Sequence, residues 1–98
     1  MKLMGISKLA ELLRSAGDVL DGAIPALVAE LEAGSWESTE EMAEFFPAAV
    51  VDGMKVRILL GPGYRVDLLA DCQAQMILID YAGSETGARA VKTGSKAA

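Results

Sequence analysis

The stretch Lys55–Leu69, KVRILLGPGYRVDLL, decides the fold of the C-terminal half of the chain. Two runs of aliphatic and β-branched residues flank the tripeptide Gly61-Pro62-Gly63. Proline presets φ near about −65° and suits the second position of a turn, while glycine can take a positive φ, so this tripeptide predicts a β-hairpin. The hairpin places Arg57 and Arg65 on adjacent strands.

Arg57 and Arg65 are the first candidate functional residues. Paired guanidinium groups on one sheet can clamp a phosphodiester and offset the charge that builds up during phosphoryl transfer. Arginines on a sheet face in contact with water also serve solubility or pair with carboxylates. The spacing alone leaves both interpretations open.

The sequence around the hairpin predicts a small antiparallel sheet. Apolar runs separated by turn signals continue on both sides of it, and the pair Asp52-Gly53 is a second hairpin signal. The expected strands are AAVV at 48–51, MKVRILL at 54–60, YRVDLL at 64–69 and AQMILIDY at 74–81.

The last expected strand has two largely apolar faces. A strand period of two points Ile77, Ile79 and Tyr81 to one face and the residues between them to the other. We therefore expect this strand to be central in the sheet or covered.

The N-terminal half is expected to be helical. Leucines at helical spacing predict a short amphipathic helix over 8–15. A second helix, which is capped by Asp18 or Asp21 or else starts near Ile24, is expected to end at Ala33.

A third, short helix is expected over 39–46. Ser38, followed three residues later by Glu41, has the pattern of a capping box, and the alternative is an irregular loop held by the neighbouring aromatic residues. Together these elements predict one α+β domain over residues 1–98, with two or three N-terminal helices packed on a four-stranded antiparallel sheet. The small and polar residues 83–98 are expected to form a flexible tail.

The composition leaves few options for catalysis. Apolar residues make up 52% of a chain of 98 residues, which is enough for one small core. Cys72 is the single cysteine and the chain has no histidine, so an intramolecular disulfide, the usual zinc and iron ligand sets and histidine-based triads are excluded. We expect no metal site and no cofactor.

The charge of the chain is distributed unevenly. The net charge is −5, which argues against tight nucleic-acid binding, because that affinity comes largely from lysine and arginine. Residues 11–52 carry ten acids and one arginine, whereas residues 53–98 carry six bases and four acids, so positive potential is confined to the half that holds the hairpin. No apolar run approaches the roughly 20 residues that a bilayer needs, and we expect a cytoplasmic protein.

Three segments resemble the RelE/ParE/HigB superfamily of toxin-antitoxin toxins, and most closely its branch of addiction module killer proteins from bacteria and phages. They are KVRILLGPGYRVDLL at 55–69, QMILIDYAGSETG at 75–87 and ARAVKTG at 88–94; LVAELEAGS at 27–35 fits a family helix more loosely. The likeness covers most of residues 24–94 and is most specific over 55–69. It implies the RelE-like fold of helices on a small sheet.

The resemblance also implies a function. Such proteins are metal-independent endoribonucleases that cleave mRNA, usually on the ribosome, and a small helix-turn-helix antitoxin neutralises them. Carried over by position, the resemblance makes Arg57 and Arg65 phosphate clamps and Tyr64 a proton-transfer or base-stacking residue. It assigns further RNA contacts to Lys55, Arg89 and Lys92.

A second interpretation is a non-catalytic module that binds proteins, either a second copy of itself as a homodimer or an antitoxin-like partner. The acidic net charge favours it, and so does Glu85, which stands where the family has a lysine. Asp67 lies on the same strand face as Arg65 and is predicted to neutralise it by pairing. The candidate partner-binding residues, which otherwise belong to the core, are Trp36, Phe45 and Phe46.

Overall fold

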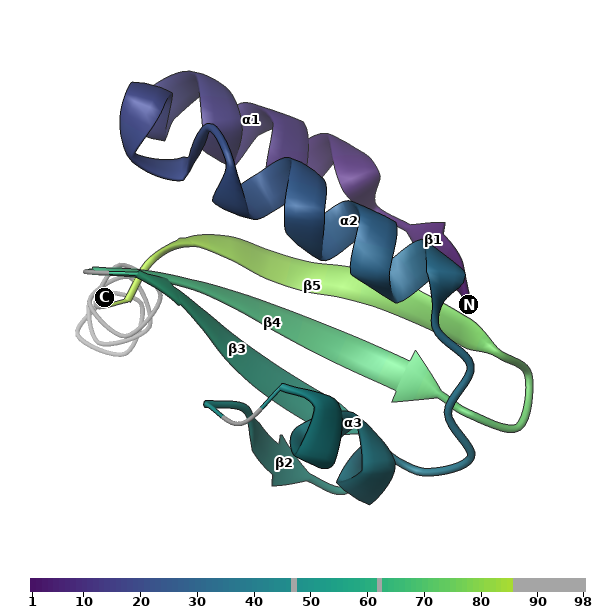
Figure 1. Ribbon diagram of the computed structural model, residues 1–98. Helices are drawn as coiled ribbons and strands as arrows, with labels where there is room; N and C mark the ends of the chain where they lie inside the picture. Colours follow the sequence, from purple (N-terminus) through teal and green to yellow (C-terminus); the bar gives the residue numbers. More distant parts are fainter. Residues whose placement is uncertain (47, 62, 86–98) are drawn as a thin grey trace, which may run out of the picture.

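A computed structural model describes residues 1–46, 48–61 and 63–85. The described elements are β1 (Lys2–Met4), α1 (Ile6–Ala16), the 3-10 helix η1 (Gly17–Leu20), α2 (Ala23–Ala33), α3 (Thr39–Phe45), β2 (Val50–Asp52), β3 (Lys55–Gly61), β4 (Tyr64–Asp71) and β5 (Met76–Ser84). They form an α+β arrangement in which α1 and α2 lie side by side along β5, and α3 lies at β2 and β3 (Figure 1).

The described strands form one mixed sheet of five strands in the order β1-β5-β4-β3-β2. The expected antiparallel run from β2 to β5 is confirmed. The expected four-stranded, purely antiparallel sheet is wrong, because β1 adds a fifth strand that pairs with β5 in parallel. β1 has only three residues, too few for a periodic pattern, and its partner lies at the other end of the sequence.

Both expected hairpins are present. Asp52 pairs with Lys55 across the first connection, and Gly61 pairs with Tyr64 across the second. β5 lies between β1 and β4, which confirms that the last strand is central.

The three expected helices are present, and α2 begins at Ala23, close to the alternative start near Ile24 and not after a cap at Asp18 or Asp21. Only α1 begins clearly earlier than expected, at Ile6. The residue before it, Gly5, takes the left-handed conformation with φ 78° where the chain turns out of strand β1 into the helix.

α3 starts as expected, with the amide of Glu41 donating to the Ser38 hydroxyl at 3.2 Å. The Glu41 carboxylate in turn accepts from the amide of Glu37 at 2.9 Å, one residue earlier than in a standard capping box.

The core lies between the helices and one face of the sheet. Leucine and isoleucine side chains from α1, η1 and α2 are fully or almost fully buried against alternate residues of β3, β4 and β5. On β4 the buried apolar residues are Val66, Leu68 and Ala70. Strand periodicity therefore turns Arg65 and Asp67 to the opposite face, which is called here the open face.

The C-terminal end of the sheet reaches further than expected. β5 keeps Gly83 and Ser84 in the sheet, so these two residues do not belong to the expected tail; residues 86–98 lie outside the described residues. None of the described helices combines the length and the hydropathy that crossing a membrane requires.

Candidate functional site

The candidate site is one row of residues across the open face. Val50 on β2 is opposite Arg57 on β3, Arg57 is opposite Asp67 on β4, and Asp67 is opposite Tyr81 on β5. Residues opposite one another in a sheet have side chains on the same face, within reach of each other. The hairpin thus brings Arg57 and Arg65 to a shared neighbour, Asp67.

A β-bulge in β5 brings Tyr81 into this row. Leu68 is opposite Ile79 and Asp67 is opposite Tyr81, so Asp80 is an extra residue. An extra residue inverts the alternation of the strand beyond it, and the carbonyl of Asp80 is held by the Lys8 ammonium of α1 at 2.9 Å. The expectation that Tyr81 shares a face with Ile77 and Ile79 is therefore wrong.

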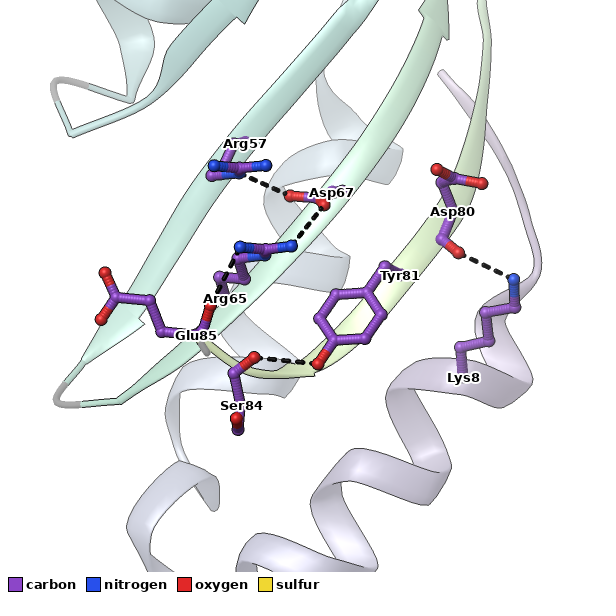
Figure 2. Close-up of polar contacts among 8 residues, drawn as sticks. All are labelled: Lys8, Arg57, Arg65, Asp67, Asp80, Tyr81, Ser84 and Glu85. Atoms are coloured by element: carbon purple, nitrogen blue, oxygen red, sulfur yellow. Dashed lines mark hydrogen bonds and ion pairs between the residues drawn. The ribbon is translucent and has the colours of Figure 1, made fainter. Parts of the chain in front are cut away.

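The Asp67 carboxylate joins the two arginines (Figure 2). One oxygen accepts from Arg57 Nε at 3.0 Å, and the other lies 3.4 Å from a terminal nitrogen of Arg65. The predicted pairing of Asp67 with Arg65 is confirmed, and Arg57 shares the same carboxylate. The side chain of Arg57 is 50% exposed whereas that of Arg65 is 8% exposed. A ligand from solution could therefore contact Arg57 but hardly Arg65.

Arg65 is fixed from several sides. Besides the ion pair, its second terminal nitrogen donates to the carbonyl of Glu85 at 2.9 Å, and the ring of Tyr81 lies 5.1 Å from its guanidinium carbon. Its Nε is buried with no hydrogen-bond partner in the described part of the chain. Ring contact and ion pairing keep this cation in place at the cost of one unsatisfied donor.

Gly83 makes room for the Tyr81 ring. The Tyr81 hydroxyl donates to the carbonyl of Ser84 at 2.8 Å, so the ring extends along β5 toward its C-terminal end, as Figure 2 shows. A Cβ on Gly83 would be 2.7 Å from that hydroxyl oxygen and 3.0 Å from the ring carbon that carries it. A glycine two residues after Tyr81 is therefore part of what holds the ring over Arg65.

The row of Val50, Arg57, Asp67 and Tyr81, together with Arg65, lines a hollow of about 630 Å³ on the open face. Its charged lining consists of Lys55, Arg57, Arg65, Asp52, Asp67 and Asp80. Positive and negative side chains are equal in number, so the hollow has no strong net potential. An anion could be met there by Lys55 and by the exposed part of Arg57. The described residues contain no group of carboxylate or cysteine side chains that could hold a metal ion.

The structure separates the other predicted site residues. Tyr64 is half-buried, packs against the core and does not line the hollow. Arg89 and Lys92 lie outside the described residues. Trp36, Phe45 and Phe46 cluster at α3, with ring centroids 4.8–6.0 Å apart, away from the arginines.

Tyr81, Asp52 and Asp80 are the site residues that the sequence did not reveal. Asp52 could have been found, because a two-residue hairpin after it places it beside Lys55. Tyr81 and Asp80 depend on the bulge, for which only the glycine at position 83 is a local signal.

Compared with known proteins, the chain matches no family model and no curated protein. The toxin superfamily suggested by the sequence therefore stays a proposal.

Proposed function

We propose that this protein is a toxin-like RNA-binding protein, a metal-independent endoribonuclease that acts on mRNA at the ribosome or a weakly active relative of one. One observation supports the proposal most: the open face gathers Lys55, Arg57 and Arg65 around a hollow with a tyrosine at its side. Cations and an aromatic ring in one groove are the elements that bind single-stranded nucleic acid. A small helix-turn-helix antitoxin would be the natural partner.

The two arginines would act differently. Arg57 uses one nitrogen for Asp67 and has a half-exposed side chain, so its terminal nitrogens can meet a phosphate. Arg65 is buried and fully engaged except for Nε, and it would position Asp67 and Tyr81 rather than bind RNA itself. Charge that develops on a phosphate during cleavage would thus be met mainly by Arg57.

Binding is tested with a labelled single-stranded RNA and fluorescence anisotropy at low salt. Arg57→Ala should weaken binding about tenfold, the effect of one lost charge-assisted contact. Arg14→Ala is the matched control, because Arg14 is exposed on α1 and carries the same charge; it should leave the affinity unchanged. Equal effects of both substitutions would mean that the hollow does not bind RNA.

Cleavage is tested separately, by inducing the protein in bacteria and mapping transcript ends with and without ribosomes. An active toxin stops growth and cuts transcripts, and Arg57→Ala should abolish both effects. Normal growth with intact transcripts, together with Arg57-dependent RNA binding, would identify a binding protein that does not cleave.

The second candidate is the non-catalytic protein-binding module. The observation in its favour is that Asp67 already occupies both arginines, so that neither is free of a counter-charge. It predicts a stable homodimer or a partner complex, which light scattering of the purified protein and of its complex would detect. A monodisperse monomer that captures no antitoxin-like protein from its own operon would exclude it.

A further inference from the structure

A second surface lies away from the hollow, in a groove of about 460 Å³ between α2 and the end of α3. Its floor is made by small residues at helical spacing on α2, Ala29 and Ala33, and its wall by Trp36 and Phe45. Two small side chains four residues apart lie on one face of a helix and allow another helix to approach closely.

The wall of the groove is an organised aromatic cluster. Phe45 is 51% exposed, although its ring packs edge-on against Trp36 at 5.5 Å and against Phe46 at 4.8 Å. Gly34 permits this packing, because a Cβ there would overlap the indole ring of Trp36. A large aromatic side chain held rigidly at the surface has the character of an interface anchor.

The helices and the loop around the groove carry acidic side chains, of which Glu30 lines the groove itself. α2, α3 and the loop between them contain six acidic residues and no basic one: Glu30, Glu32, Glu37, Glu40, Glu41 and Glu44. All six are exposed, and none has an ion-pair partner among the described residues. Like charges gathered on one small surface repel one another, and a cationic partner would relieve that repulsion.

We infer that this groove binds a basic amphipathic helix of a partner protein. The apolar side chains of the helix would cover Phe45 and the α2 alanines, and its lysines and arginines would face the glutamates. The inference goes beyond RNA binding and does not rest on it, because none of the groove residues lines the hollow.

The test uses a labelled synthetic peptide of about 18 residues, five helical turns, with leucine on one face and lysine on the other. Anisotropy measures its Kd, and the emission of Trp36, the single tryptophan, reports whether it binds at the groove. We expect saturable binding that weakens with salt, a shift of the Trp36 emission, and no binding of the same peptide with glutamate in place of lysine.

Variants locate the site. Phe45→Ala should weaken binding at least tenfold, whereas Val19→Ala, which truncates an even more exposed apolar residue of η1, should not change it. Glu30→Gln with Glu44→Gln should weaken binding several-fold and reduce its salt dependence. Arg57→Ala should bind the peptide normally, so that a failure of this inference is distinguishable from a failure of the proposed RNA binding.

Three outcomes would overturn the inference. In the first, the acidic and basic peptides bind equally. In the second, Phe45→Ala is folded by circular dichroism and binds the peptide as tightly as the unaltered protein. In the third, replacing the basic residues Arg89, Lys92 and Lys96 with glutamate in the full chain tightens peptide binding, which would mean that the C-terminal segment itself occupies the groove.

Discussion

Replacing Asp67 by asparagine tests whether the open face depends on one carboxylate. The substitution keeps the size of the side chain and one hydrogen-bond acceptor but removes the charge that faces Arg57 and Arg65. Arg65 is 7% exposed and already has one unsatisfied nitrogen, so its charge would then be buried without a counter-charge.

The magnitude follows from the burial of the two partners. Removing one member of a buried ion pair costs about 3–5 kcal/mol. The Asp67 side chain is 22% exposed, and asparagine can still accept a hydrogen bond, so we expect a smaller loss of about 2–3 kcal/mol in the free energy of unfolding. For a domain of this size that lowers Tm by roughly 10–20 °C.

Urea unfolding followed by circular dichroism measures the loss. Arg57→Ala is the control, because it breaks only the exposed half of the network and should cost about 0–1 kcal/mol. Combining Asp67→Asn with Arg65→Met removes the buried charge as well and should recover part of the stability. If Asp67→Asn costs no more than Arg57→Ala, the charge of Arg65 is solvated and the reasoning is refuted.

Three further predictions concern Gly83, Cys72 and Asp67. Gly83→Ala should lower the free energy of unfolding in urea by about 1–3 kcal/mol, because the new Cβ would displace the Tyr81 ring. Gly22→Ala is the control. A Cβ at Gly22 meets nothing, so this variant should be neutral or stabilising. Burial and then the charges of Asp71, Glu41 and Glu40 raise the pKa of the Cys72 thiol. Iodoacetamide should therefore react with Cys72 more slowly at pH 8 than with a free cysteine, and Asp71→Asn should speed the reaction. A rate equal to that of free cysteine would contradict this prediction. Asp67→Asn should bind single-stranded RNA about threefold to tenfold more tightly at a temperature at which it is folded, since the hollow then has more cations than carboxylates; unchanged or weaker binding would count against an RNA site.

The sequence predicted the elements whose signals are local. The hairpins after Asp52 and around Pro62 depend on turn residues, and the start of α3 depends on Ser38 capping the amide of Glu41. β1 could not be predicted in this way, because its pairing with β5 is set by residues at opposite ends of the chain. α1 starts at Ile6, two residues after β1 ends, so its start lies next to this non-local pairing.

The candidate site was predictable only in part, because some of its geometry depends on residues that are distant in sequence. Arg57, Arg65 and Asp67 follow from the hairpin and the strand period, and the structure brings all three together. Tyr81 was assigned to the wrong face because one extra residue, Asp80, inverts the alternation. The bulge depends on contacts that are not local in sequence, including the bond from Lys8 on α1 to the carbonyl of Asp80.

The balance of charge in the hollow limits how any RNA can bind there. Arg65 is committed to Asp67, and the remaining cations of the described hollow are Lys55 and the exposed part of Arg57. Each phosphate contact on a single strand contributes about −0.7 to the slope of log K against log salt, so two contacts give a slope of about −1.4. A slope near that value would be consistent with binding at the hollow alone. A slope twice as steep would require cations from beyond it, and Arg89, Lys92 and Lys96 are the bases that follow Arg65 in the sequence.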